Sequence, residues 1–275
     1  MSHFYDSIEN QEMVDLLDEL SYWSAPFGMS LLDAVNFRGV ANVLDIGFGL
    51  GFPLLELAMR FGNTSQVFGI DPWQAGTARA SQKMMASGIS NVSLITAEAE
   101  DMPFEDNIFD LIVSNNGINN VRDMEKVLAE CNRVSRKSAQ LVFTMNTDQT
   151  FMDFYRVYRE SLHELGLQEY NGAISRHIFE KRIPLLHLQN RLLKAEFRIR
   201  SIREDSFTYR FANGTAMLDH SFIKLAFLPS WKEILPEDIR EPVFKKIEEK
   251  LNEISRLAGQ LAMRVPFVTV DCKKD

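Results

Sequence analysis

The stretch Val43-Leu44-Asp45-Ile46-Gly47-Phe48-Gly49-Leu50-Gly51 decides the fold of this 275-residue chain. It is a short apolar run that contains an acid, followed by three glycines at alternate positions. Pro53 and an apolar-periodic segment come directly after it. The pattern predicts a strand, a glycine turn and the start of a helix, which form the first half of a βαβ unit. Glycine suits such a turn because it adopts positive φ without strain and lets a bound group approach the backbone.

The spacing of the glycines distinguishes two kinds of nucleotide site. A dinucleotide-binding turn has the pattern G-x-G-x-x-G, which would place glycine at position 52, where this chain has Phe52. The pattern found here, acid-x-G-x-G-x-G, resembles motif I of the class I S-adenosylmethionine-dependent methyltransferases. A tight strand-to-helix turn that binds no ligand is the alternative reading of this run.

A second acid follows the next predicted strand, 66–70, and this acid is Asp71. In either nucleotide-binding fold, an acid here accepts hydrogen bonds from ribose hydroxyls. It could equally cap the helix that follows. Pro72 and Trp73 come next, and Trp73 either covers an adenine face or packs on the predicted helix 75–87.

The third predicted strand, 92–96, leads to Glu98 and Ala99. The resemblance implies that Glu98 meets the adenine amino group and that the Ala99 backbone N–H meets the ring. Asn115 and Asn116 end the fourth strand, where the family lines the methionine part of the cofactor and the acceptor. The resemblance covers about residues 43–146. It implies an S-adenosylmethionine site made by Asp45, Gly47, Phe48, Gly49, Gly51, Asp71, Pro72, Trp73, Glu98, Ala99, Asn115 and Asn116.

Composition argues against several classes of partner. The net charge is −8, and the sequence shows no concentrated basic segment, so we expect no nucleic-acid partner. Cys131 and Cys272 are far apart and match no metal-ligand spacing, which predicts a metal-free site. Met1–Asp6 does not resemble a leader, and no apolar run reaches the ~20 residues that span a bilayer. We therefore expect a cytoplasmic protein with no membrane partner, either a monomer or a homodimer.

Strands and helices alternate from residue 43 to about 146, which favours a parallel sheet. The predicted fold is α/β, a Rossmann-like, seven-stranded, mostly parallel sheet sandwiched by helices. Residues 1–40 are expected to form an N-terminal helical cap, because apolar residues from Ile8 to Leu20 have helical spacing. An ordinary packing helix is the equal alternative. The aromatic residues that follow are candidates for the wall of a substrate pocket: Tyr22, Trp23 and Phe27.

The methyltransferase domain is expected to span 41–275, with a helical insertion at about 212–260 between the last two strands. That insertion is either a lid or a dimer surface. Other predicted helices are 151–165, 178–193 and 238–257. Strand six is expected in two pieces, 197–199 and 207–211, with a bend between them. The last strand is expected at 265–272, with Pro266 marking an edge or a strand start.

The resemblance implies methyl transfer from S-adenosylmethionine to a small-molecule acceptor by in-line displacement. Orientation of the reactants can lower such a barrier by about 7–11 kcal/mol, which agrees with the absence of a recognisable triad. A general base is needed only for a weakly acidic acceptor, and His220 is the best candidate among the five histidines. A lone histidine is more often structural. The alternative functions are an NAD(P)-dependent Rossmann oxidoreductase and a non-catalytic S-adenosylmethionine-binding protein.

Overall fold

The computed structural model describes residues 11–19, 22–37, 39 and 41–275, which divide into two compact units. The first unit contains the chain up to Asn146 together with Leu185–Asp205 and Phe267–Asp275. The second contains Thr147–Pro184 and Ser206–Pro266. Ile8, Leu20 and Met1–Asp6, on which the predictions of a cap and of no leader partly depend, lie outside the described residues. The domain boundaries given above stay predictions.

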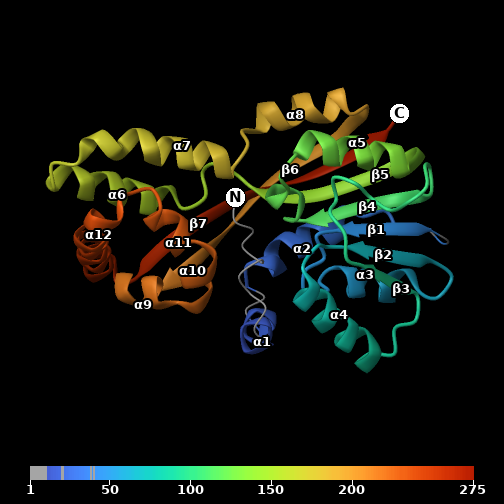
Figure 1. Cartoon of the computed structure of the whole chain (residues 1–275), viewed down its shortest axis with the longest axis horizontal. Helices are drawn as coiled ribbons and strands as arrows, with labels where there is room; N and C mark the ends of the chain where they lie inside the picture. The colour runs from blue at the N-terminus through green and yellow to red at the C-terminus, as the bar shows by residue number, and fades with distance from the viewer. Residues whose placement is uncertain (1–10, 20–21, 38, 40) are drawn as a thin grey trace. The chain divides into compact units, whose positions relative to one another are not determined.

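A seven-stranded sheet has the order β3-β2-β1-β4-β5-β7-β6 (Figure 1). Neighbours among its first five strands pair in parallel, and β7 pairs antiparallel with β5, in a register from Gln140↔Lys273 to Asn146↔Phe267. This confirms the predicted fold class. The strands are β1 (Asn42–Ile46), β2 (Gln66–Ile70), β3 (Val92–Ile95), β4 (Phe109–Asn115), β5 (Ser135–Asn146), β6 (Phe197–Phe211) and β7 (Leu261–Lys274).

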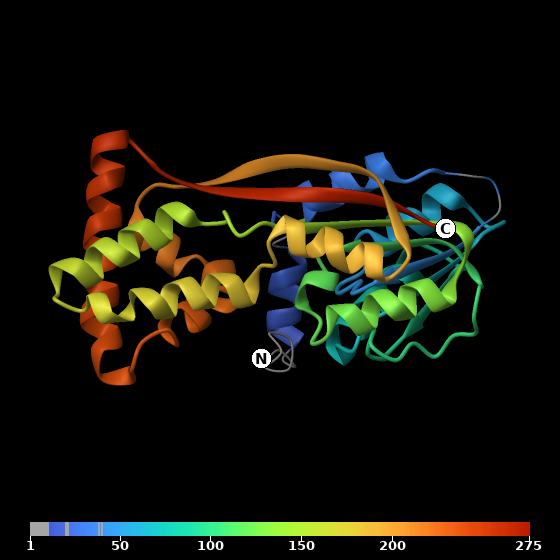
Figure 2. The ribbon, with the colours of Figure 1, turned by 90° about the horizontal axis from the view of Figure 1, so that it is seen from above.

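Helices cover both faces of the sheet in the first unit. Figure 2 shows α5 and α8 on one side and α2 and α3 on the other. On α3 the buried residues recur at helical spacing, and each fully buried Leu or Phe contributes about 1.5–3 kcal/mol. The helices of this unit are α1 (Gln11–Glu19), α2 (Ser24–Ala34), α3 (Leu54–Phe61), α4 (Gln74–Ala86), α5 (Met124–Val134) and α8 (Leu185–Lys194).

The second unit is helical and packs around Trp231. The Phe154 ring stacks on the Trp231 ring at 3.9 Å, Trp231 Nε1 donates to the Tyr155 hydroxyl at 3.1 Å, and the Tyr158 hydroxyl donates to the Trp231 carbonyl at 3.1 Å. These bonds satisfy a large buried aromatic side chain that carries a polar atom. The helices are α6 (Met152–Glu164), α7 (Asn171–Lys181), α9 (Gly214–Asp219), α10 (Ser221–Ala226), α11 (Leu228–Lys232) and α12 (Glu237–Ala258).

Three predicted elements differ from the structure. The single helix expected at 178–193 is two helices, because the chain turns extended at Arg182 and Pro184 disfavours helical backbone at the residue before it. Strand six has no bend, and β6 is continuous as an edge strand, where alternating charged residues face solvent without cost. Pro266 lies inside β7, one residue before the pairing with β5 begins.

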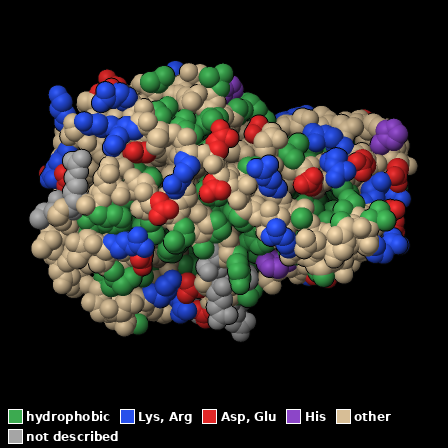
Figure 3. Space-filling view, turned by 180° about the vertical axis from the view of Figure 1, so that it is seen from behind, with side chains coloured by type: hydrophobic (Ala, Val, Ile, Leu, Met, Phe, Trp, Pro, Cys, Tyr) green, Lys and Arg blue, Asp and Glu red, His purple; other side chains and the backbone are tan. Residues whose placement is uncertain are grey.

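The surface carries charged side chains of both signs, as the numbers of basic and acidic residues lead one to expect. Figure 3 shows, on one face, Lys and Arg side chains interspersed with Asp and Glu. Among the helices of the described residues, none is both long and apolar enough to cross a bilayer.

Candidate functional site

The candidate site lies where the strand order reverses, between β1 and β4. In open α/β sheets, ligands bind beyond the carboxyl ends of the strands at this switch point. Ser114 joins the two strand ends: its hydroxyl donates to the Ile46 carbonyl at 2.8 Å and accepts the Ile118 N–H at 2.9 Å. Gly47 and Gly117 complete the junction, because a Cβ on Gly47 would lie 2.9 Å from the Gly117 Cα.

The three glycines of the turn have different surroundings. All three have positive φ, with values of 75° at Gly47, 53° at Gly49 and 102° at Gly51. A Cβ on Gly51 would meet Leu55 at 3.1 Å, so this glycine permits close helix packing. A Cβ on Gly49 would meet nothing within 4 Å. Gly49 is therefore where the turn presents bare backbone to open space, as a bound nucleoside requires.

Asp71 holds this turn in place from the end of β2. Its carboxylate is 5% exposed; Oδ2 accepts the Gly49 N–H at 2.8 Å and Oδ1 accepts the Trp73 N–H at 2.9 Å. Burial raises the pKa of Asp71, the two N–H groups lower it, and the Glu98 charge raises it. Because each carboxylate oxygen can accept more than one bond, the group retains capacity for ligand hydroxyls.

Asp45, near the carboxyl end of β1, is fully buried. Neither carboxyl oxygen has a well-formed hydrogen bond among the described residues. Burial, and then the charge of Asp71, raise the pKa of Asp45 well above its usual range, while the Leu54 backbone N–H acts in the opposite direction. A buried acceptor of this kind calls for a donor or a positive charge from outside the protein. The ammonium and sulfonium groups of S-adenosylmethionine fit that requirement.

Helix α1 is linked to the same turn through Lys83 on α4. Lys83 Nζ donates to the Leu50 carbonyl at 2.7 Å and to Asp18 on α1 at 2.7 Å. Arg79 adds a second ion pair to Asp18 at 2.8 Å. These partly buried contacts attach α1 to the glycine turn.

Glu98 and Ala99, the predicted adenine contacts, follow β3. Glu98 is half-buried and lies 3.6 Å from Arg122, while Ala99 is buried. The loop that continues from them is held by Arg133, which the sequence analysis missed. Arg133 donates to the Phe104 and Met102 carbonyls at 2.7 and 3.0 Å and pairs with Glu130 at 2.7 Å. The Glu130–Arg133 spacing on a predicted helix was the available signal.

Asparagines gather at the ends of β4 and β5. Asn115 accepts the Thr144 hydroxyl at 2.9 Å and donates to the Ser24 carbonyl of α2 at 3.1 Å. Asn116 has a φ of 58° and donates its N–H to the Thr144 carbonyl at 3.0 Å. Asn119 donates to the Asn146 side chain. Asn115 and Asn116 were predicted from the sequence. Four further residues of this network were not, namely Ser24, Asn119, Thr144 and Asn146.

Several predicted site residues have side chains in the core. Phe48 packs over Gly69, and Trp73 packs on Gly76 of α4 and in a cluster with Val14 of α1, which is the packing alternative raised for Trp73. Phe27 is fully buried against Phe267 at a ring distance of 4.7 Å. By contrast, Pro72 is exposed, Trp23 is half-buried and Tyr22 is 72% exposed. The pocket-wall assignment of Tyr22, Trp23 and Phe27 stays a prediction.

His220 belongs to the second unit, between α9 and α10. It lies against the rings of Phe211 at 5.6 Å and Tyr209 at 6.3 Å, and burial lowers its pKa. Its Nδ1 is buried without a hydrogen-bond partner among the described residues. Its role as a general base stays a prediction.

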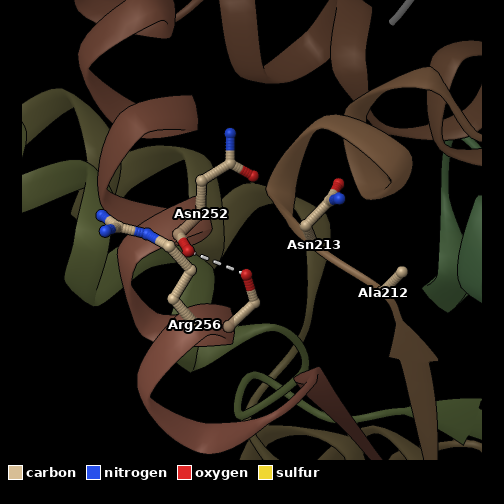
Figure 4. A pocket seen from close by; sticks show the side chains of 5 residues that line it. Ala212, Asn213, Asn252 and Arg256 are labelled. Atoms are coloured by element: carbon tan, nitrogen blue, oxygen red, sulfur yellow. Dashed lines mark hydrogen bonds between the residues drawn. The ribbon is translucent and has the colours of Figure 1, made fainter.

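The same unit contains a cavity of about 290 Å³ (Figure 4). Its walls come from the residues just after β6 and from α12, and none of the predicted site residues lines it. Its lining residues are Ala212, Asn213, Asn252, Ser255 and Arg256. Within the described ranges, no three His, Cys, Asp or Glu side chains form a group that could hold a metal ion.

Comparisons with known proteins show which family part of the first unit is similar to. Residues 44–143 match a family model described as a methyltransferase domain. The chain is 35% identical over 141 residues to 2-phytyl-1,4-naphtoquinone methyltransferase of Trichormus variabilis, covering 48% of this chain and 62% of that protein. It is 31% identical over 124 residues to demethylmenaquinone methyltransferase of Geobacillus kaustophilus, covering 45% and 53%. The matches thus span between half and two thirds of the length of these curated relatives.

A solved structure of a Bacillus halodurans protein assigned as a methyltransferase shares the fold, with a TM-score of 0.59, 15% identity, and coverage of 90% of this chain and 98% of that one. An Aquifex aeolicus protein described as a SAM dependent methyltransferase also shares the fold, with a TM-score of 0.54, 20% identity, and coverage of 70% of this chain and 91% of that one. Residues 44–143 belong to the methyltransferase domain family.

Proposed function

We propose that this protein transfers a methyl group from S-adenosylmethionine to a small-molecule acceptor. The observation that carries the proposal is the Asp71–Gly49 hydrogen bond of 2.8 Å, which fixes an open glycine turn at the switch point of the sheet. In this geometry, a carboxylate that can accept hydrogen bonds from ribose hydroxyls lies next to backbone that a nucleoside can approach closely. The match of residues 44–143 to the methyltransferase family favours this function over a nicotinamide-dependent oxidoreductase.

Each residue then has a role in binding or orientation. Asp71 accepts the ribose hydroxyls, Gly49 lets the nucleoside approach, and Glu98 and Ala99 read the adenine. Asp45 stabilises the positive charge at the methionine end through its orphaned carboxyl. Asn115 and Asn116 line the methionine part and the acceptor. When bound, S-adenosylmethionine supplies a methyl group on an electrophilic sulfonium carbon, so the residues of the chain mainly orient the acceptor and exclude water.

The acceptor is proposed only by class. The named relatives act on naphthoquinone-type compounds, but their similarity covers less than half of this chain. Prenylated quinols therefore belong in an acceptor panel beside phenols and amines. His220 would act as a base only for an acceptor that must lose a proton, so replacing it should matter for phenols and not for amines.

The test compares two aspartates that each accept a backbone N–H from the first unit. Asp71 lies at the carboxyl end of β2, while Asp110, which accepts the Asn42 N–H at 2.9 Å, lies near the amino end of β4. Calorimetry with S-adenosylhomocysteine should show a loss of affinity of about ten-fold or more for Asp71→Asn, because one good charge-assisted bond is worth roughly 1.5–3 kcal/mol. Asp110→Asn should bind like the wild type.

Transfer of a labelled methyl group to the acceptor panel completes the test. Saturable binding without transfer to any acceptor would favour a non-catalytic binding protein. Equal affinity of all three proteins, or no binding by the wild type, would refute the proposed site.

A further inference from the structure

The second unit contains a buried arginine without a partner. Arg182 follows α7 at its C-terminal end, and its side chain is 4% exposed. Nε and Nη1 are both buried, and neither has a hydrogen-bond partner among the described residues. A guanidinium group cannot lose its proton in a protein, so the positive charge is buried with these donors unmet.

The protein itself offers little compensation for this charge. The negative end of the α7 dipole attracts a cation, but this attraction is small compared with the cost of desolvating an unpaired ion. No ion pair or ring stack to Arg182 occurs within the described part of the chain. Lys181 adjoins Arg182 in the chain, and both positive charges lower the pKa of His177. The local field therefore favours an anion.

We propose that Arg182 binds the carboxylate or phosphate group of a small molecule. This anion site belongs to the second unit and does not depend on the proposed methyl transfer. Arginine suits this role because its planar fork matches both groups with two parallel bonds.

The burial of the Arg182 guanidinium limits which ligands can reach it. Since only a few per cent of the side chain is accessible, a folded protein surface or a bilayer cannot contact the guanidinium. A small molecule that inserts one anionic group can do so. The same group would supply acceptors for Nε and Nη1, which removes the cost of burying them unpaired.

The experiment measures melting temperature in the full chain at constant ionic strength, with chloride replaced by acetate, benzoate or phosphate. The wild type should gain about 3–6 °C with at least one of these anions at 50 mM, because a ligand that binds only the folded state stabilises it. Arg182→Met should show no such gain. Arg176→Met, which changes an exposed arginine on the same helix, should respond like the wild type.

Two further measurements keep the result unambiguous. In chloride, Arg182→Met should melt at or above the wild-type temperature, since an unpaired buried charge has been removed. Arg182→Lys should keep part of the anion response if the methionine variant folds poorly. A response to benzoate or acetate but not to phosphate identifies a carboxylate site, and the reverse identifies a phosphate site.

The inference is overturned if the three anions shift the wild type and Arg182→Met equally, or shift neither. A failure of the proposed function would look different, because S-adenosylhomocysteine would not bind to the wild type at all. Arg182→Met should bind S-adenosylhomocysteine within about two-fold of the wild type, because it changes no residue of the proposed S-adenosylmethionine site.

Discussion

Gly47 and Gly117 pack backbone against backbone, and neither position has room for a side chain. A Cβ on Gly117 would lie 2.5 Å from the Ile46 carbonyl oxygen and 2.9 Å from the Ser114 hydroxyl. This contact brings the ends of β1 and β4 together and shapes the switch point. Two glycines far apart in sequence thus set the geometry of one ligand site.

Gly117→Ala should therefore destabilise the first unit by about 1–3 kcal/mol, as overpacking of a tight site does. Gly172→Ala is the control, because a Cβ there meets nothing within 4 Å and the position lies in α7. It should be neutral or stabilise by about 0.5–1 kcal/mol. Urea unfolding followed by circular dichroism measures both, and equal stability of the two variants would contradict the close contact.

Gly49→Ala should reduce affinity for S-adenosylhomocysteine far more than it reduces stability. The φ of 53° makes alanine cost roughly 1–2 kcal/mol in folding, and the added methyl group projects into the space expected for the ligand. Gly88→Ala has the same kind of strain, with φ at 64° and open space around it, but lies at the end of α4. We expect calorimetry to show weakened binding only for Gly49→Ala. Parallel losses in both variants would indicate a general effect of strain.

Asp45→Asn should stabilise the ligand-free protein at neutral pH and weaken S-adenosylhomocysteine binding. The folded-state pKa of Asp45 is raised, so the folded state binds the proton more tightly than the unfolded state. Stability therefore falls as pH rises through the range between the two pKa values and stays lower above it. The asparagine variant avoids this loss, with a gain of about 1–2 kcal/mol near pH 7 that shrinks in acid.

Asp33→Asn, at an exposed position of α2, serves as the control and should show neither effect. Thermal melts from pH 4 to pH 8 measure the gain. An Asp45→Asn variant that is less stable than the wild type at every pH would show that the carboxyl has structural partners.

The second unit should lose stability in mild acid through His177. Burial, with Lys181 and Arg182, lowers the pKa of His177 to about 4. The unfolded state takes up the proton near pH 6.5, so stability falls as pH drops from 6.5 toward 4 and is constant below that. Allowing for partial solvent screening, the loss is about 1–2 kcal/mol. His177→Gln should be less sensitive between pH 7 and pH 5 than the wild type, and His187→Gln, at an exposed position of α8, should not.

Sequence alone predicted the local structure of the candidate site, where the glycine turn is joined to the acid at the end of β2. The glycine turn and Asp71 follow from a strand, a φ requirement and a strand-end acid, all within a short stretch of chain. Arg133 could not be predicted in its role, because its partners Met102 and Phe104 are carbonyls brought close only by the tertiary fold. Trp73 was ambiguous for a similar reason: the sequence gives its position but not whether its ring faces α1 or a ligand.

The misjudged elements also have physical causes. Apolar spacing continues through Pro184, so periodicity merged α7 and α8 although proline separates them. The two predicted pieces of β6 are joined by a stretch that contains the charged residues Arg203–Asp205. The strand continues through them because an edge strand tolerates charges on its open side. Arg182 was not noticed, because burial of a single arginine has no sequence signature.

Lys83 links the glycine turn to α1. Its ammonium group binds both the Leu50 carbonyl of the glycine turn and Asp18 of α1, so a movement of the turn on ligand binding should also move α1. A fluorophore placed on α1 at Asp15 would sense occupancy of the turn without touching the ligand. Affinities could then be followed optically, and the signal should vanish in Lys83→Met while calorimetry still records binding.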